Sequence, residues 1–288
     1  MSIPDIDAAE QFIAAHGRVL DRRRFERLFR GGEAQPVRDA VAAYRNPDRG
    51  FGHGLEPDGR TPASQPAAVE LGLRILHEAD AWSAGLATGA CDWLAATAPA
   101  EGGSVFVDAS VQGWPHAPWW AAEEGRPASL VSTGQIAGTL HARGVRHPWL
   151  DRATEVMWSR IAGLSEAGPY GMLGVLRFLD HVPDRDRATE AFAGAVPLLF
   201  KLDLVETDPD AAGEKFRPLN FAPAPGCLAR SLFDDATIDA HLDHLAAAQR
   251  EDGGWMFSWP SWSPAAEAEW RGSMTVDALR TLRGYGRL

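Results

Sequence analysis

One short segment constrains the fold of this 288-residue chain more than any other. Residues 249–255 begin with Gln249, continue through Gly253 and Gly254, and end at Trp255. Two successive glycines let the backbone leave a helix through positive φ. Gln249 can then hydrogen-bond the freed backbone groups, and Trp255 can pack across the end of a neighbouring helix. The segment therefore predicts a glycine turn closed by an aromatic side chain.

The same order of acidic, glycine and aromatic residues recurs earlier in the chain. Residues 46–52 contain Asp48, Gly50 and Phe51 in this order, and residues 101–106 form a weaker copy. A turn that is repeated in this way is typical of proteins built from one supersecondary unit used several times.

Each of the three turns is followed by a run rich in alanine and leucine with helical periodicity. We expect Ser64, Ser132 and Ser273 to be the N-cap residues of these helices, because serine hydroxyls accept hydrogen bonds from free backbone N–H groups. Three turns, each leading into a capped helix, predict a repeat of helical hairpins.

The motif also carries a family resemblance. Gln249, Gly253 and Trp255 match the Gln-x-x-x-Gly-x-Trp motif of squalene-hopene cyclases, and the pattern of turn and helix resembles the repeat of terpene cyclases and protein prenyltransferase β subunits. Those proteins are α/α toroids, in which inner and outer helices alternate around a cavity. The resemblance implies an all-α fold, with residues 1–288 forming one α/α toroid of about six helical hairpins, each of about 48 residues.

Composition excludes several classes of function. A net charge of −11 and a pI near 5.3 argue against a nucleic-acid partner, which needs a basic surface. Cys91 and Cys227 are the only cysteines, and they form neither a disulfide framework nor a metal-ligand spacing. The N-terminus lacks the pattern of a secretion signal, and no apolar run is long enough for a membrane span. We therefore expect a cytoplasmic protein, and we predict no metal and no cofactor.

Residues 46–64 are polar and rich in glycine, which predicts a loop that can approach a ligand closely. His53, Glu56 and Asp58 combine an imidazole with two carboxylates, the groups used in acid–base catalysis and in metal binding. The structural alternative is that Glu56 and Asp58 cap helix ends and pair with Arg60.

A second irregular segment, residues 99–130, carries a further acid and several aromatic side chains. Long loops inside compact domains are often functional. Asp108 is the candidate acid of this segment. The candidate substrate-binding residues here and after the last turn are Trp114, His116, Trp119, Trp120, Trp259 and Trp262. They either line a cavity or plug one end of the toroid as apolar packing.

Two charged patterns favour structural roles. Residues 6–30 read as one long amphipathic helix, with Arg22, Arg23 and Arg24 on a solvated face. Asp234 and the acid after it resemble the start of a magnesium-binding Asp-Asp-x-x-Asp motif, but Ile238 replaces the last aspartate. We therefore expect a helix N-terminus there, where acids complement the helix dipole.

The resemblance implies acid-initiated cyclisation or isomerisation of an apolar, isoprenoid-like small molecule without a metal. The candidate acids are then Asp108, His53, Glu56 and Asp58. The Asp-x-Asp-Asp motif of class II cyclases is missing, since its nearest match, residues 184–187, lacks the last aspartate and resembles a helix start.

Two alternatives stay open. One is a carbohydrate-active enzyme, because α/α toroids also host glycoside hydrolases and lyases. The other is a binding or scaffold toroid without catalysis. The oligomeric state is open.

Overall fold

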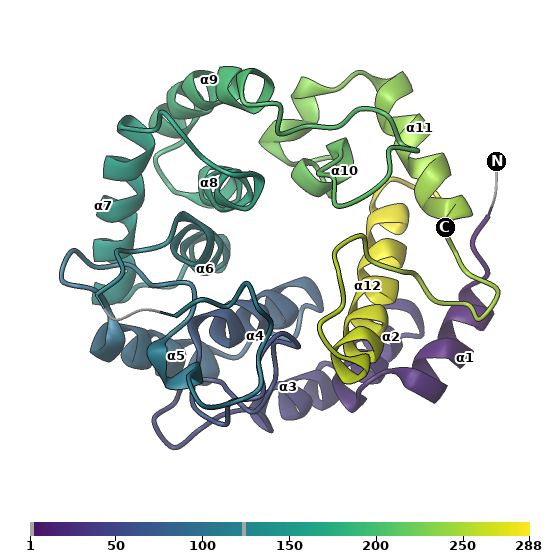
Figure 1. Cartoon of the computed structure of the whole chain (residues 1–288), viewed down its shortest axis with the longest axis horizontal. Helices are drawn as coiled ribbons and strands as arrows, with labels where there is room; N and C mark the ends of the chain where they lie inside the picture. The colour runs from purple at the N-terminus through teal and green to yellow at the C-terminus, as the bar shows by residue number, and fades with distance from the viewer. Residues whose placement is uncertain (1–2, 123–124) are drawn as a thin grey trace. The chain divides into compact units, whose positions relative to one another are not determined.

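The computed structural model of this protein describes residues 3–122 and 125–288, and these residues form helices joined by loops, with isolated bridges but no β-strand (Figure 1). The prediction of an all-α fold is confirmed. The α-helices are α1 (Ile6–His16), α2 (Val19–Phe29), α3 (Ala34–Ala42), α4 (Pro66–Glu78), α5 (Ala84–Thr97), α6 (Leu130–Ala142), α7 (Pro148–Ala162), α8 (Pro169–His181), α9 (Arg185–Lys201), α10 (Pro218–Phe221), α11 (Asp235–Ala247) and α12 (Pro264–Gly284), and the 3₁₀-helices are η1 (Ala109–Val111) and η2 (Leu228–Leu232).

The chain divides into two compact units. Unit 1 contains residues 3–37 and 203–288, and unit 2 contains residues 38–202, so that α3 carries the chain from one to the other. A single toroid over residues 1–288 stays a prediction.

Unit 2 has two layers of helices. The helices α4, α6 and α8 lie side by side in one layer, and α5, α7 and α9 form the other (Figure 1). Nine of the thirteen residues of α4 are buried, which explains its composition of alanine, leucine and valine. The apolar periodicity of residues 65–79 and 84–97 predicts two helices, and they correspond closely to α4 and α5.

Glycines bring α6 and α8 into backbone contact. A Cβ atom added to Gly134 of α6 would lie 2.3 Å from the carbonyl oxygen of Gly174 in α8. One added to Gly138 would lie 2.4 Å from the Arg177 oxygen, and one added to Gly174 would lie 2.1 Å from the Leu130 oxygen. Because any side chain needs more room than this, the close approach of the two helices depends on these glycines.

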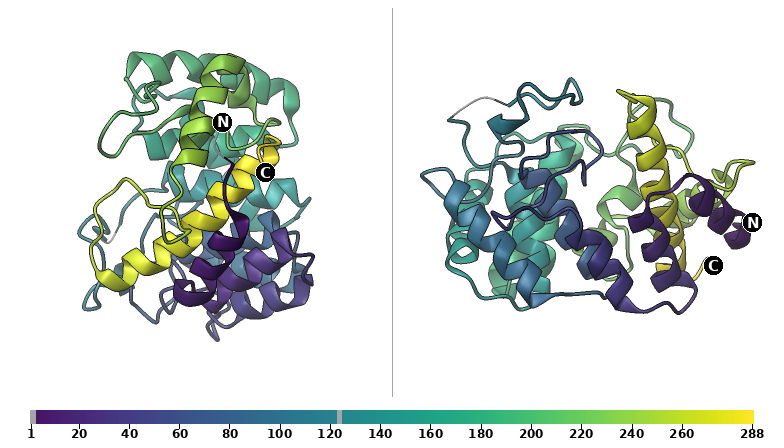
Figure 2. Two further views of the ribbon diagram at one scale, coloured as in Figure 1. Left: turned by 90° about the vertical axis from the view of Figure 1, so that its right-hand side faces the viewer. Right: turned by 90° about the horizontal axis from the view of Figure 1, so that it is seen from below.

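In unit 1, the N-terminal helices pack against the long helix α12 (Figure 2). The prediction of one helix over residues 6–30 is wrong, since α1 ends at His16 and α2 begins at Val19. The Gly17 N–H donates to the Ile13 oxygen at 2.9 Å and closes α1, while Gly17 and Arg18 take extended backbone conformations. This break lets both helices contact α12.

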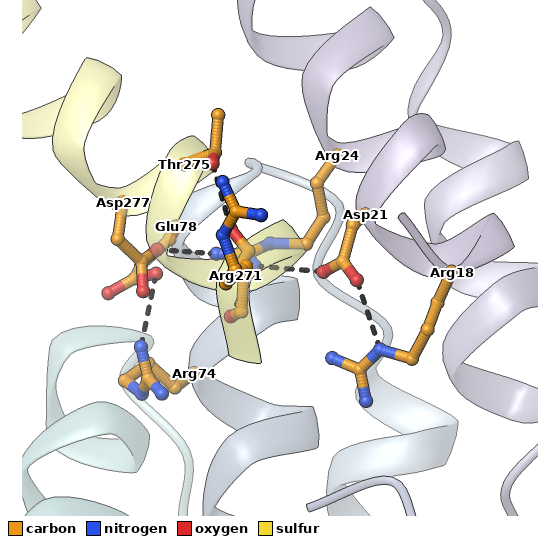
Figure 3. A network of polar contacts seen from close by, with 9 residues as sticks. Arg18, Asp21, Arg24, Arg74, Glu78, Arg271, Thr275 and Asp277 are labelled. Carbon is orange, nitrogen blue, oxygen red and sulfur yellow. Dashed lines mark hydrogen bonds and ion pairs between the residues drawn. The ribbon is translucent and has the colours of Figure 1, made fainter. Parts of the chain in front are cut away.

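A buried ionic network ties α2 to α12. Arg24 is 1% exposed, and its Nη2 donates to Asp277 Oδ1 at 2.7 Å (Figure 3). Its Nη1 donates to Ser273 Oγ at 3.1 Å and lies 3.4 Å from Asp21 Oδ1. The second oxygen of Asp21 accepts from Arg18 Nε at 3.0 Å. The predicted solvated face is therefore wrong for Arg24, which α12 covers, whereas the other two arginines of that cluster are exposed.

The roles predicted for Gln249 and Trp255 are confirmed. Gln249 Oε1 accepts from the Asp5 N–H at 2.7 Å, and its Nε2 donates to the Asp5 oxygen at 2.8 Å and to the Gly253 oxygen at 2.9 Å. Trp255 is 2% exposed, and its Nε1 donates to the Leu245 oxygen at 2.8 Å, near the end of α11. The turn therefore fastens the start of α1 to the end of α11.

The first turn repeats this geometry. The Arg250 N–H donates to the Gly254 oxygen at 2.9 Å, and the Asn46 N–H donates to the Gly50 oxygen at 3.0 Å. The residue before the glycine that accepts this bond has a positive φ in each turn, +89° at Gly253 and +77° at the corresponding arginine, residue 49. The two turns therefore share one backbone conformation, even though the left-handed residue is glycine in only one of them.

The N-cap residues after the turns differ from those predicted. The residues that cap α4, α6 and α12 are Gln65, Ser129 and Ser263, in place of Ser64, Ser132 and Ser273. The cap of α4 lies one residue later than predicted and that of α12 ten residues earlier, because a proline occupies the first turn of each helix, where its fixed φ suits a helix start. By contrast, the predicted helix starts at Asp234 and Asp184 are confirmed, since both carboxylates accept a backbone N–H three residues on.

Candidate functional site

Two loops of unit 2, residues 46–65 and 104–122, carry most of the predicted site residues, and we call them the loop pair. The Arg60 N–H donates to the Pro115 oxygen at 2.9 Å, and the Ala117 N–H donates to the Asp58 oxygen at 2.7 Å. Between these bonds, residue 59 pairs with His116 in an isolated antiparallel bridge. Backbone hydrogen bonds therefore hold the two loops against each other.

Asp58 anchors the loop pair through its side chain. It is 6% exposed, and its Oδ2 accepts from Trp119 Nε1 at 2.8 Å. Glu56 Oε2 accepts from the Asp58 N–H at 2.7 Å. Both carboxylates are used within the loop pair and neither caps a helix, which corrects that part of the structural alternative. Asp58 holds Trp119 in place, and Glu56 stays half-buried beside it.

A very small cavity lies beneath the loop pair. Glu56, Gln65 and Trp120 are among the residues that line its volume of about 10 Å³. Trp120 is 2% exposed, and its buried Nε1 has no hydrogen-bond partner within residues 3–122 and 125–288. A cavity of this size has room for about one water molecule. The cavity therefore has no room for a larger ligand.

The other two candidate acids lie in different settings. The Asp108 N–H donates to Gln65 Oε1 at 2.9 Å, and Asp108 Oδ1 caps η1 by accepting from the Ser110 N–H at 2.9 Å. His53 is exposed, has a φ of +55°, and places its Nε2 2.8 Å from Asn46 Oδ1. Gln65 thus brings Asp108 to the edge of the small cavity, whereas His53 is held within its own turn.

Three aromatic side chains of the second loop are exposed. The exposed fractions are 39% for Phe106, 48% for Trp114 and 43% for Trp119. Phe106 packs edge to face on the buried Trp120, with 6.2 Å between ring centroids. His116 is half-buried, and its Nδ1 lies 2.7 Å from the Trp114 oxygen. Large aromatic rings left open on a loop held by hydrogen bonds are a feature of ligand-binding surfaces.

The two remaining predicted residues lie in unit 1. Trp259 packs against Phe257 with 4.6 Å between ring centroids, and edge to face on Trp270 at 5.3 Å. Trp262 is half-buried in the same loop. The rings of Phe257, Trp259 and Trp270 therefore pack on one another, as expected of an aromatic plug.

The sequence analysis missed a polar face on α4. Glu70, Arg74 and Glu78 are spaced four residues apart, and Arg74 lies 3.0 Å from Glu70 and 3.7 Å from Glu78. Figure 3 labels Arg74 and Glu78. The Glu70 side chain is 15% exposed, and burial raises the pKa of its carboxyl although Arg74 opposes this. The signal was the four-residue spacing of charges inside an otherwise apolar helix.

Two histidines of the same layer are also perturbed. Burial, with neighbouring positive groups led by Arg177, lowers the pKa of His181 to about 4. Burial lowers the pKa of His141 as well, although Asp151 opposes the shift. Both imidazoles are therefore neutral near pH 7.

Comparisons with known proteins give a fold and no function. No family model matches this chain, and no curated protein matches its sequence. Among solved structures, it is similar to a protein from Actinoplanes with a TM-score of 0.57 and 16% identity, over 99% of this chain and 92% of that one. At this identity, the similarity shows the fold alone.

Three further observations bear on the candidate site. Within the described ranges, no three His, Cys, Asp or Glu side chains gather closely enough to ligate one metal. None of the helices there is both long and apolar enough to cross a bilayer. A groove of about 360 Å³ lies between α7 and α9, beside Trp158 and Arg187 and away from the predicted residues.

The low pKa of His181 predicts a stability that falls in mild acid. Because the unfolded histidine titrates near 6.5, the unfolded chain binds more protons than the folded chain between pH 6.5 and 4. The contribution of His181 to the free energy of unfolding is therefore fully present above pH 6.5 and is lost as the pH falls. After allowance for partial solvent exposure, we expect a loss of about 1 kcal/mol from pH 7 to 5. Urea unfolding at several pH values measures it. His181→Gln is expected to flatten this slope, and an unchanged slope in that variant would contradict the assignment.

Proposed function

We propose that this protein binds and processes a carbohydrate on the outer surface of the loop pair. The observation that carries the proposal is the exposure of Trp114 and Trp119, 48% and 43%, in a loop that Asp58 holds in place. Sugar rings offer apolar C–H faces for stacking and hydroxyls for hydrogen bonding. Open aromatic faces beside carboxylates match both features.

Glu56 and Asp108 are the carboxylates we assign to the chemistry. Glycoside cleavage uses two carboxyl groups, one as acid and one as base or nucleophile, about 5 to 10 Å apart. Gln65 lines the small cavity together with Glu56, and its side chain accepts a hydrogen bond from the Asp108 N–H. This supports the proposal that both acids lie near the Gln65 side chain. Asp58 is occupied by Trp119 and serves to position that ring.

Calorimetric titration with a panel of mono- and oligosaccharides tests the binding step. Trp114→Ala and Trp119→Ala are each expected to weaken binding at least about tenfold, because each removes a stacking surface. Trp119→Phe keeps a ring but loses the bond to Asp58, so a smaller loss is expected. The matched control is Phe200→Ala, which removes a ring that is 52% exposed on α9. Unchanged affinity in both alanine variants, or no binding of any sugar, would end the proposal.

The chemical step is tested separately on sugars that bind. Glu56→Gln and Asp108→Asn are each expected to keep binding and to lower turnover about 100-fold or more, because each removes one proton-transfer group. Normal turnover in either variant would remove that residue from the mechanism.

A second candidate is the acid-initiated cyclisation or isomerisation of an isoprenoid-like molecule. Carbocation chemistry requires that water be excluded, which the open tryptophans of the loop pair do not favour. Glu70 suits it better, because this half-buried carboxyl has a raised pKa and can keep a proton to donate. Loss of isoprenoid turnover in Glu70→Gln, with normal turnover in Asp108→Asn, would favour this candidate over the first.

A further inference from the structure

Two basic side chains on one face of α8 each have a buried nitrogen atom without a hydrogen-bond partner among the described residues. Arg177 and His181 are four residues apart, which puts them on the same side of the helix. Arg177 Nη2 and His181 Nε2 are both buried, and neither has a hydrogen-bond partner within residues 3–122 and 125–288. Native proteins satisfy nearly all buried polar atoms, because an unsatisfied one costs about 1–3 kcal/mol and more when it is charged.

Two arginines supply the positive charge around this face, and a carboxyl group of α4 opposes it. The groups with the strongest electrostatic effect on His181 are Arg177, His77, Arg185 and His141, all of them basic. Glu70 of α4 lies close enough to Arg177 to interact with its charge. Such a concentration of basic groups is unexpected in a chain with a net charge of −11. Near pH 7 the arginines among them carry positive charge at partly buried positions, where charges are screened less than at the surface.

The neighbouring basic groups are already engaged. Arg143 of the α6 C-cap donates from Nε to His77 Nδ1 at 2.9 Å and from Nη2 to the His77 oxygen at 2.6 Å. Arg185 Nη1 donates to the Leu179 oxygen at 2.6 Å and to the Val182 oxygen at 3.0 Å. These residues fix the helix ends, so Arg177 and His181 are the pair left to receive a ligand.

Both sides of this face are held in position. The His77 and His181 rings lie 6.1 Å apart, centroid to centroid, so α4 borders the site. On the α6 side, a Cβ atom at Gly138 would come within 3.0 Å of Arg177 Cγ, so the stem of Arg177 lies in the space that this glycine leaves. The arginine is therefore placed by packing, which lowers the entropic cost of binding a ligand.

We propose that Arg177 and His181 form a binding site for a small oxyanion, the phosphate or carboxylate group of a small molecule. An oxyanion accepts hydrogen bonds from both side chains at once, and guanidinium groups match such acceptors in shape and charge. The site lies on the helix layer of unit 2 and needs none of the tryptophans of the loop pair.

Nuclear magnetic resonance of the His181 imidazole tests this proposal in the full-length protein. Inorganic phosphate, and acetate in a separate arm, are added at constant ionic strength. A saturable shift is expected, with a rise of about one unit or more in the pKa of His181, because a bound anion stabilises the imidazolium. A response to phosphate alone, or to acetate alone, identifies which of the two chemistries the site accepts. No saturable response to either anion overturns the proposal.

Three variants make the test specific. Arg177→Gln is expected to weaken anion binding about tenfold or more, the loss that fits one hydrogen bond to a charged group. Arg177→Lys keeps the positive charge but loses the planar guanidinium with its paired donors. It keeps the test informative if Arg177→Gln does not fold. The control is Arg146→Gln, at an exposed position between α6 and α7. Equal binding in wild type and both Arg177 variants contradicts the site. Normal anion binding in Trp114→Ala separates this result from the carbohydrate proposal.

Discussion

Replacing Gly174 by alanine is expected to lower the free energy of unfolding by about 3 kcal/mol or more, because overpacked cores pay for backbone displacement. The new Cβ would lie 2.1 Å from the Leu130 oxygen and 2.8 Å from its carbonyl carbon. Both atoms belong to the backbone of α6, so no side-chain rotation relieves the contact. The helices must separate, which also opens the contacts at Gly134 and Gly138. Urea unfolding followed by circular dichroism measures the loss.

The same helix offers a matched control one turn earlier. A Cβ atom at Gly171 would lie 3.6 Å from Ala167 Cβ and 3.8 Å from Leu130 Cδ1, which are ordinary contacts. Alanine is favoured over glycine in helices, so Gly171→Ala is expected to be neutral or to stabilise by up to about 1 kcal/mol. Similar losses in both variants would show that glycine is not needed for the α6–α8 contact.

This contrast shows what a helical pattern can predict. The apolar periodicity of residues 65–79 and 84–97 predicts two helices because each helix must bury one of its own faces. The position of Gly174 carries no such signal, since a glycine inside a helix is locally unfavourable and its benefit lies in the neighbouring helix. The identity of that neighbour, α6, depends on how the layer assembles.

The same limit applies to the candidate site. The roles of Gln249 and Trp255 were predictable because a glycine turn leaves backbone groups nearby for them to bind. The hydrogen bond between Asp58 and Trp119 joins residues 61 positions apart. The sequence suggested a site there only because one loop is polar and the other is aromatic. The shifts at Glu70 and His181 depend on burial, which neighbouring helices decide.

Replacing Arg24 by methionine is expected to lower the free energy of unfolding by about 3–5 kcal/mol, the range for removing one partner of a buried ion pair. Methionine fills much of the space of the arginine stem, so the loss of volume is small. The cost comes from Asp21 and Asp277, whose side chains are 0% and 16% exposed and which lose a cationic partner at 3.4 Å and 2.7 Å. Ser273 loses its donor as well. Chemical denaturation at pH 7 gives the value.

Two further variants separate this charge effect from a general effect of altering α2. Arg23 is the adjacent residue, its side chain is 44% exposed, and it pairs with Glu26 at 2.7 Å. Because an exposed pair contributes little, Arg23→Met is expected to cost at most about 0.5 kcal/mol. Adding Asp277→Asn to Arg24→Met removes one of the two carboxylates that lose their bond to Arg24, and it is expected to recover about 1 kcal/mol or more. If the double variant is no more stable than Arg24→Met alone, the loss comes from packing between α2 and α12, and the network of charges does not account for it.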